Sequence, residues 1–243
     1  MENYSLKYLM LFVKKEIDTV VFDFDGVIIN SVAGSKQVII NVAKKYGYTV
    51  SISDLKEFSG ISWPEMFPKL GLKLGWSEEA TLFIEADSTE KAVNTAFKVA
   101  SGLFKKIIEL KNNGLKVGIL TTRTTATLIK SAELCGIDLE IFDFLGTADN
   151  LKHKKPSPAV WDDLLLRGDI KFIQKILFIG DTRVDLAASK HRKWPVLFFG
   201  VNERDEFPEP ELAGIKFFNN TVSAINFILT CKTREAAKAI PLV

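Results

Sequence analysis

Short apolar runs alternate with amphipathic segments over the second half of the sequence, and this rhythm restricts the possible folds. The runs with strand character are Lys116–Leu120, Phe142–Leu145, Lys175–Ile179, Val196–Phe199 and Lys216–Phe218. The segments with helical spacing are Leu103–Lys111, Thr124–Cys135, Ala159–Arg167, Val184–His191 and Val222–Leu229. Together with an earlier apolar run, Thr19–Phe22, this order predicts an α/β fold with a doubly wound, mostly parallel sheet.

The interval 32–100 has a different pattern, because it contains no convincing strand run. Its apolar residues recur at helical spacing in three groups. They are Val38, Ile39, Val42 and Ala43, then Leu82, Phe83 and Ala86, then Ala92, Val93, Ala96, Phe97 and Ala100. We therefore expect a helical domain at 32–100, inserted into a core formed by 1–31 and 101–243, with hinges near Asn30–Ala33 and Ala100–Gly102.

The charge balance excludes several classes of partner. The chain has 32 basic and 30 acidic residues and a net charge of +2, so we expect neither nucleic acid nor an anionic membrane surface as a partner. No apolar run is long enough to span a bilayer. Cys135 and Cys231 belong to no paired motif, which is typical of a reducing compartment and predicts a cytoplasmic protein. The first fifteen residues are interpreted as a surface or docking extension.

Two carboxylates follow the first apolar run, in the order Asp23-Phe24-Asp25-Gly26. Residues two apart in an extended chain project to the same side, so the charges of Asp23 and Asp25 are expected to crowd together beyond the strand. A divalent cation would relieve this repulsion. Gly26 permits a sharp turn and lets backbone N–H groups approach an anion. An ordinary Asp-Gly turn is the alternative interpretation of this segment.

Two further signals are suited to binding phosphate. Thr121 and Thr122 follow the apolar run 116–120, where a hydroxyl can donate to a phosphate oxygen or, alternatively, N-cap the next helix. Lys155 lies in a basic loop in which Pro156 and Pro158 restrict the backbone, which favours a directed contact by its ammonium group.

The fourth signal is Gly180-Asp181-Thr182-Arg183-Val184-Asp185, directly after a buried apolar run. Asp185 stands one helical turn beyond Asp181, and an N-cap role for Asp181 is the alternative to a functional one. All four signals occur at the carboxyl ends of expected parallel strands, where open α/β sheets bind their ligands. The sequence therefore predicts one shared site.

These four motifs, in this order, resemble those of the haloacid dehalogenase superfamily, in particular its phosphatases with a helical cap inserted after the first strand. The resemblance covers residues from about 19 to about 200 and implies a Rossmann-like core. Within this superfamily, the sequence resembles the subfamily of phosphoglycolate phosphatases and β-phosphoglucomutases. The resemblance implies a phosphatase that acts on a small soluble phosphomonoester and that is a monomer or homodimer.

The resemblance also implies a role for each motif residue. Asp23 would be the nucleophile that forms an aspartyl-phosphate, and Asp25 would be the general acid and then the general base. Mg²⁺ would be held by the carboxylate of Asp23, the backbone carbonyl of Asp25 and Asp181, with Asp185 supporting this shell. The predicted phosphate-binding residues are Gly26, Thr121, Thr122 and Lys155.

Three points concern the choice within the superfamily. Asp25 favours phosphate esters over dehalogenase chemistry. A β-phosphoglucomutase is ranked lower, because Ser35 stands where those enzymes carry a histidine in the helical cap, and His153 and His191 lie outside it. A non-catalytic binding module is a further alternative, although no motif acid is missing.

The expected cap contains one segment that can select the substrate. The loop residues Ser59, Gly60, Ile61 and Trp63 are predicted to do so, since a glycine turn between helices can dip toward the phosphate. In the alternative interpretation, Trp63-Pro64-Glu65 only starts the next helix.

Overall fold

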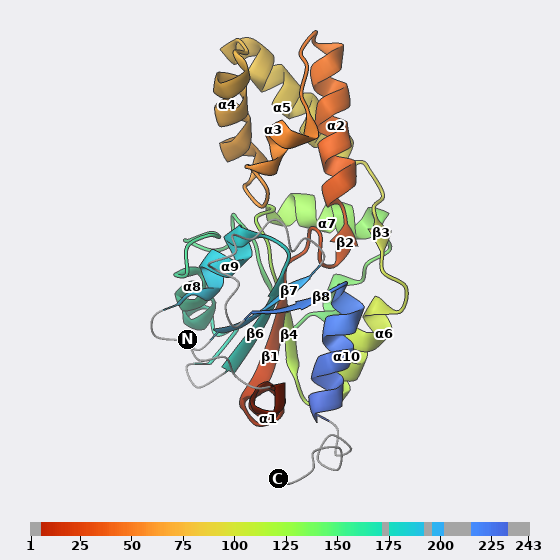
Figure 1. Ribbon diagram of the computed structural model, residues 1–243, viewed down its shortest axis with the longest axis vertical. Helices are drawn as coiled ribbons and strands as arrows, with labels where there is room; N and C mark the ends of the chain where they lie inside the picture. The colour runs from red at the N-terminus through yellow and green to blue at the C-terminus, as the bar shows by residue number, and fades with distance from the viewer. Residues whose placement is uncertain (1–5, 172–174, 192–195, 202–214, 233–243) are drawn as a thin grey trace.

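A parallel sheet forms the centre of the molecule (Figure 1). The computed structural model describes residues 6–171, 175–191, 196–201 and 215–232. The sheet has the strand order β5-β4-β1-β6-β7-β8, and every neighbouring pair is parallel. The strands are β1 (Ile17–Phe22), β4 (Lys116–Leu120), β5 (Phe144–Gly146), β6 (Lys175–Gly180), β7 (Val196–Val201) and β8 (Lys216–Phe218). This arrangement confirms the predicted doubly wound α/β fold.

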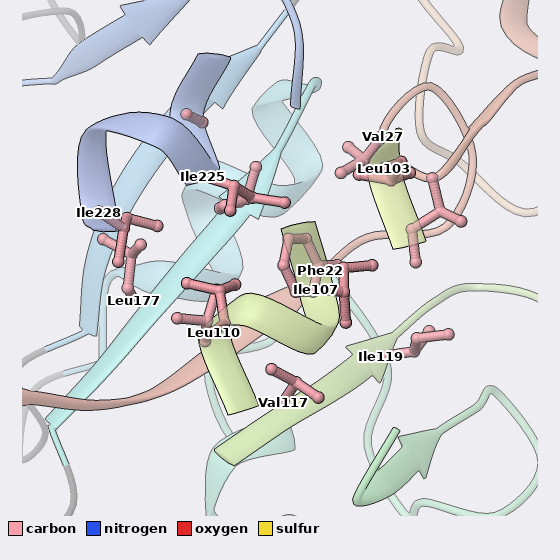
Figure 2. Close-up of a cluster of buried hydrophobic side chains, with 14 of the residues drawn as sticks. Phe22, Val27, Leu103, Ile107, Leu110, Val117, Ile119, Leu177, Ile225 and Ile228 are labelled. Atoms are coloured by element: carbon pink, nitrogen blue, oxygen red, sulfur yellow. The ribbon is translucent and has the colours of Figure 1, made fainter. Parts of the chain in front are cut away.

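Helices cover both faces of this sheet, as parallel strands joined by helical crossovers require. On one face lie α6 (Leu103–Asn112), α7 (Thr125–Leu134) and α10 (Thr221–Lys232). On the other lie α8 (Val160–Leu166) and α9 (Arg183–Ser189). Val20 and Phe22 of β1 belong to the first core and Val21 to the second, which explains why β1 is apolar at consecutive positions. Figure 2 shows part of the first core, around Phe22 and Ile107.

The N-terminal segment docks on the core. Residues Leu6–Glu16 form α1, which packs against α10 at the foot of the sheet (Figure 1). Val13 is fully buried, and the ammonium group of Lys232 donates to the carbonyl oxygen of Lys14 at 3.0 Å. Of the two expectations for the first fifteen residues, docking is correct for 6–15, and 1–5 lie outside the described residues. No helix in the described part of the chain is long and apolar enough to cross a membrane.

A second layer of helices stands above the carboxyl ends of the strands (Figure 1). It consists of α2 (Val32–Lys45), α3 (Ile52–Lys56), α4 (Trp63–Leu74) and α5 (Glu78–Val93), and we call it the helical cap. These helices bury a core of their own, which includes Val42, Phe67 and Ile84. The domain boundaries at 32 and 100 stay a prediction.

The end of this interval differs from the expectation of helix up to Ala100. Helix α5 ends at Val93, and Lys98–Val99 form a short strand, β3, antiparallel to β2 (Ile29–Asn30). The prediction of helix here was wrong because Phe97 is buried against the main core and the two connections pair with each other, which overrides the local spacing. A smaller difference concerns β5, which begins two residues later than predicted, after a 3₁₀ turn at Leu139–Ile141.

Helix α6 offers a test of the main core, because it places a buried and an exposed isoleucine side by side. Ile107 is fully buried, whereas Ile108 is 46% exposed. We expect Ile107→Ala to lower the free energy of unfolding by about 2–5 kcal/mol, since it leaves a cavity that the sheet cannot fill. Ile108→Ala is the control and should cost about 0.5 kcal/mol or less. Urea unfolding measures both, and equal losses would contradict this description of the core.

Candidate active site

Asp23 directly follows β1, and its carboxylate is buried against the ammonium group of Lys155. The backbone N–H of Asp23 donates to the carbonyl oxygen of Ile179 at 2.9 Å, which attaches this residue to β6. Lys155 Nζ donates to Asp23 Oδ1 at 2.7 Å and to Asp185 Oδ1 at 2.5 Å. Lys155 is only 5% exposed, so the restricted loop does direct its charge inward, as predicted.

Asp181 and Asp185 approach the same point from the end of β6. The N-cap of α9 is Thr182, whose backbone N–H and hydroxyl donate to Asp185 Oδ2 at 3.1 Å and 2.6 Å. Both oxygens of Asp185 are therefore occupied, one by Lys155 and one by Thr182. The carboxylate of Asp181 caps nothing: both of its oxygens are buried and have no hydrogen-bond partner in the described part of the chain. The N-cap alternative for Asp181 was wrong.

The buried ammonium group of Lys155 thus lies among three buried carboxylates, those of Asp23, Asp181 and Asp185. Burial, and then the negative charge of Asp185, raise the pKa of Asp23 to about 7 against the opposing effect of Lys155. Burial also raises the pKa of Asp181 well above its ordinary value, followed by the charges of Asp185 and Asp23. For Lys155, burial works against the charged form, but the two neighbouring aspartates outweigh it and raise its pKa.

This cluster fits a divalent metal ion. Ligand oxygens of Asp23, Asp181 and Asp185 all lie within 4.8 Å of one another. Carboxylate oxygens are the donors that hard cations such as Mg²⁺ and Ca²⁺ take. A buried carboxylate without a partner is costly, and a cation beside Asp181 would remove that cost.

The second acid of the first motif, Asp25, turns away from this cluster and pairs with Arg123. Arg123 Nε donates to Asp25 Oδ2 at 2.7 Å, and a terminal guanidinium nitrogen donates to Oδ1 at 2.8 Å. Ser31 Oγ donates to Oδ1 at 2.6 Å. Burial would raise the pKa of Asp25, but the charge and hydrogen bonds of Arg123, with the bond from Ser31, hold it below its ordinary value. A guanidinium group therefore relieves part of the repulsion that the sequence analysis assigned to a metal ion.

Gly26 is required by the close approach of Asp181. Its φ is +73°, and a Cβ at this position would lie 1.9 Å from Asp181 Oδ2. The N–H of Gly26 donates to the carbonyl oxygen of Ile29 at 2.8 Å, so the structure uses this amide to close the loop. The backbone at Gly26 therefore forms an ordinary turn, as the alternative interpretation proposed. The space that a side chain at this position would fill is occupied by the carboxylate of Asp181.

Thr121 and Thr122 follow β4, next to the first motif. Thr121 is 3% exposed, and its hydroxyl accepts from the backbone N–H of Arg123 at 3.2 Å. Thr122 lines the cavity described below. The N-cap of α7 is Thr124, whose hydroxyl accepts from the N–H of Thr127. The N-cap alternative for Thr121 and Thr122 was therefore wrong, and their contact with phosphate stays a prediction.

A cavity of about 520 Å³ lies between the helical cap and the carboxyl ends of the strands, with Asp23, Asp25 and Asp181 in its wall. Residues 59–63 close it from the cap side, and all four predicted selection residues, Ser59, Gly60, Ile61 and Trp63, line it.

The loop from the cap touches the core at Gly60. A Cβ on Gly60, whose φ is +78°, would lie 2.6 Å from Thr182 Oγ1. Nearby, Arg183 donates to the carbonyl oxygen of Glu57 at 3.1 Å, and Lys154 Nζ pairs with Glu65 Oε1 at 2.6 Å. Trp63 is also the first residue of α4, so the two interpretations of this segment are compatible. Its role in selection stays a prediction.

Arg123 and Ser31 contact Asp25, yet no sequence pattern predicted a role for either. Both stand next to residues with a predicted role, but neither belongs to a motif that demands a charge or hydroxyl there. Arg123 comes from the turn after β4 and reaches Asp25 only because β4 and β1 are neighbours in the sheet. The order of these strands was the missing information.

Comparisons with known proteins agree with this geometry. The family described as haloacid dehalogenase-like hydrolase matches residues 20–199. Pyrophosphatase PpaX of Bacillus cereus (strain G9842) is 28% identical over 180 residues, which are 72% of this chain and 79% of that protein.

Solved structures share the fold. A predicted phosphoglycolate phosphatase from Haemophilus somnus 129PT has a TM-score of 0.69 at 16% identity, covering 86% of this chain and 97% of that one. A β-phosphoglucomutase from Clostridium difficile has a TM-score of 0.65 at 20% identity, covering 88% and 97%. These findings confirm the resemblance seen in the motifs. Because the family match spans most of the sequence, this chain belongs to the haloacid dehalogenase-like hydrolases.

Proposed function

We propose that this hydrolase is a Mg²⁺-dependent phosphatase that cleaves a small phosphorylated metabolite through an aspartyl-phosphate on Asp23. The observation that carries the proposal is the buried cluster at the wall of the cavity, in which Asp23 contacts Lys155 and the oxygens of Asp181 have no hydrogen-bond partner among the described residues. The names of the relatives, a pyrophosphatase and a predicted phosphoglycolate phosphatase, support the same reaction class.

In the first half of the reaction, Asp23 is the nucleophile. Lys155 holds Asp23 Oδ1, and the other carboxylate oxygen attacks phosphorus while the ester P–O bond breaks. The charge of Lys155 offsets the repulsion between an anionic nucleophile and an anionic substrate. Thr121 and Thr122 are proposed to hold the phosphoryl oxygens beside it, whereas the N–H of Gly26, also expected to do so, already donates to Ile29.

Asp25 moves the protons. As the acid it gives a proton to the departing oxygen, and as the base it takes one from the water that hydrolyses the aspartyl-phosphate. The pair with Arg123 keeps Asp25 ionised, which is the form of the base. A phosphoryl dianion next to Asp25 raises its pKa and so favours the proton that the acid needs.

Mg²⁺ is proposed to bind to the carboxylates of Asp23 and Asp181 and to the backbone carbonyl of Asp25. It would supply positive charge for the phosphoryl oxygens. Asp185 supports the site rather than binding the ion, because its two oxygens already accept from Lys155 and Thr182.

Hydrolysis is favoured over phosphoryl transfer within a sugar, since the helical cap contains no histidine and Ser35 lines the cavity. Three of the four motif acids, Asp23, Asp181 and Asp185, gather around Lys155, and the fourth, Asp25, pairs with Arg123, which also disfavours a non-catalytic role. We further propose a cytoplasmic location and a monomer or homodimer. The thiols of Cys135 and Cys231 are free, as suits a reducing compartment.

Asp23→Asn tests the nucleophile. We expect phosphate release from p-nitrophenyl phosphate to fall by about three orders of magnitude or more, because an amide cannot form the acyl phosphate. Circular dichroism and the melting temperature check that the variant is folded. Activity equal to that of the unchanged protein would exclude the proposed mechanism.

The pH dependence of stability tests the buried carboxylate cluster. Without metal, the free energy of unfolding should fall as pH rises from about 4 to about 7. Asp23 has an ordinary pKa of 3.8 and a folded pKa of about 7, so the folded state holds its proton longer than the unfolded state does.

At pH 8 in EDTA, Asp181→Asn should stabilise the protein by about 1 kcal/mol or more, because it removes an unpaired buried charge.

Mg²⁺ should raise the melting temperature of the unchanged protein more at pH 8 than at pH 5, since protons compete for the same carboxylates. Asp181→Asn should lose this response, while Asp138→Asn, at an exposed turn, should keep it. An Asp181→Asn protein that Mg²⁺ still stabilises fully would place the ion elsewhere.

Arg123→Lys tests the control of Asp25. Lysine keeps the charge but cannot donate twice to the carboxylate, so we expect kcat/KM to fall by about tenfold or more. The weaker pair should raise the pKa of Asp25 and shift the alkaline limb of the pH profile, where the acid loses its proton, to higher pH. Arg167→Lys is the control, because Arg167 contacts Leu145 and Asp169 and does not line the cavity. A lowered kcat/KM with an unshifted profile would show that Arg123 only supports the fold.

A further inference from the structure

The helical cap presents mainly apolar side chains to the cavity. They include Ile39, Leu55, Phe58, Ile61, Trp63 and Met66. The phosphoryl group belongs at the opposite wall, beside Asp23 and Asp25, so these side chains face the position of the leaving group. A cavity of about 520 Å³ leaves room there for a group the size of an aromatic ring.

Each positively charged residue that lines the described cavity already has a partner. Arg123 holds Asp25, Lys154 pairs with Glu65, and Lys36 also has an interaction partner. A second phosphate or a carboxylate on the substrate would need a cation to replace its water. Among the described residues, the cap side of the cavity offers no positively charged group that lacks a partner.

An acid stands there instead. Glu85 of α5 lines the cavity and forms no ion pair with any residue in the described part of the chain. Glu85 is half-buried, and burial raises the pKa of its carboxyl group. Ser62 also lines the cavity, and its Oγ is buried without a hydrogen-bond partner among the described residues.

We propose that the cap selects phosphomonoesters whose leaving group is largely apolar and carries no second negative charge, with Glu85 rejecting those that do. This inference rests on the proposed phosphatase activity. Selection then has an attractive part, the apolar wall, and a repulsive part, the carboxylate of Glu85. It separates this chain from the activity in the name of its relative, since pyrophosphate has an anionic leaving group.

The test compares benzyl phosphate with 4-carboxybenzyl phosphate, which differ by one distant charge, together with glycerol 1-phosphate and inorganic pyrophosphate. With Mg²⁺ at pH 8, we expect kcat/KM to be highest for benzyl phosphate. Glu85→Gln should shift the ratio of kcat/KM between the two benzyl esters toward the charged one by about fivefold to tenfold. Glu90→Gln, on the exposed side of the same helix, should leave this ratio unchanged.

Each result is decisive. A preference for pyrophosphate, glycerol 1-phosphate or the charged benzyl ester would overturn this inference and leave the phosphatase proposal standing. A ratio that Glu85→Gln does not change would remove Glu85 from substrate selection. Failure to hydrolyse any of the four compounds would overturn the proposed function and this inference together.

Discussion

The ammonium group of Lys155, buried between Asp23 and Asp185, is the interaction on which the site depends. It joins the end of β1 to the start of α9 and lets two carboxylates remain buried side by side. One positive charge is not enough for three carboxylates, because Asp181 next to them has no hydrogen-bond partner among the described residues. The remaining negative charge makes this cluster the candidate site for a cation.

The two acids of the first motif are treated differently by their surroundings. Asp23 lies in the dry cluster, where burial raises its pKa, and Asp25 lies against Arg123, which lowers its pKa. Residues two apart in sequence thus reach opposite electrostatic environments. Such a division is what a reaction needs when one carboxylate attacks and the other exchanges protons. The cap reaches this part of the core through Gly60, which lies against Thr182.

Much of this site could be predicted from sequence, because each acid or hydroxyl follows an apolar run and parallel strands end at one edge. The structure shows the expected convergence for Asp23, Lys155 and Asp181. Arg123 could not be found this way, since its function depends on β4 lying beside β1. Nor could local spacing reveal that the chain after Val93 leaves the helix to pair with β2.

The sequence by itself determined the fold class, the order of strands and helices along the chain and the residues at the strand ends. These follow from periodicity and from polar residues at the ends of apolar runs, which are local properties. Only the tertiary structure decided which charges pair, which described carboxylate stays without a partner and which side chains line the cavity. Those outcomes depend on distances between residues far apart in the chain, and burial makes each of them energetically large.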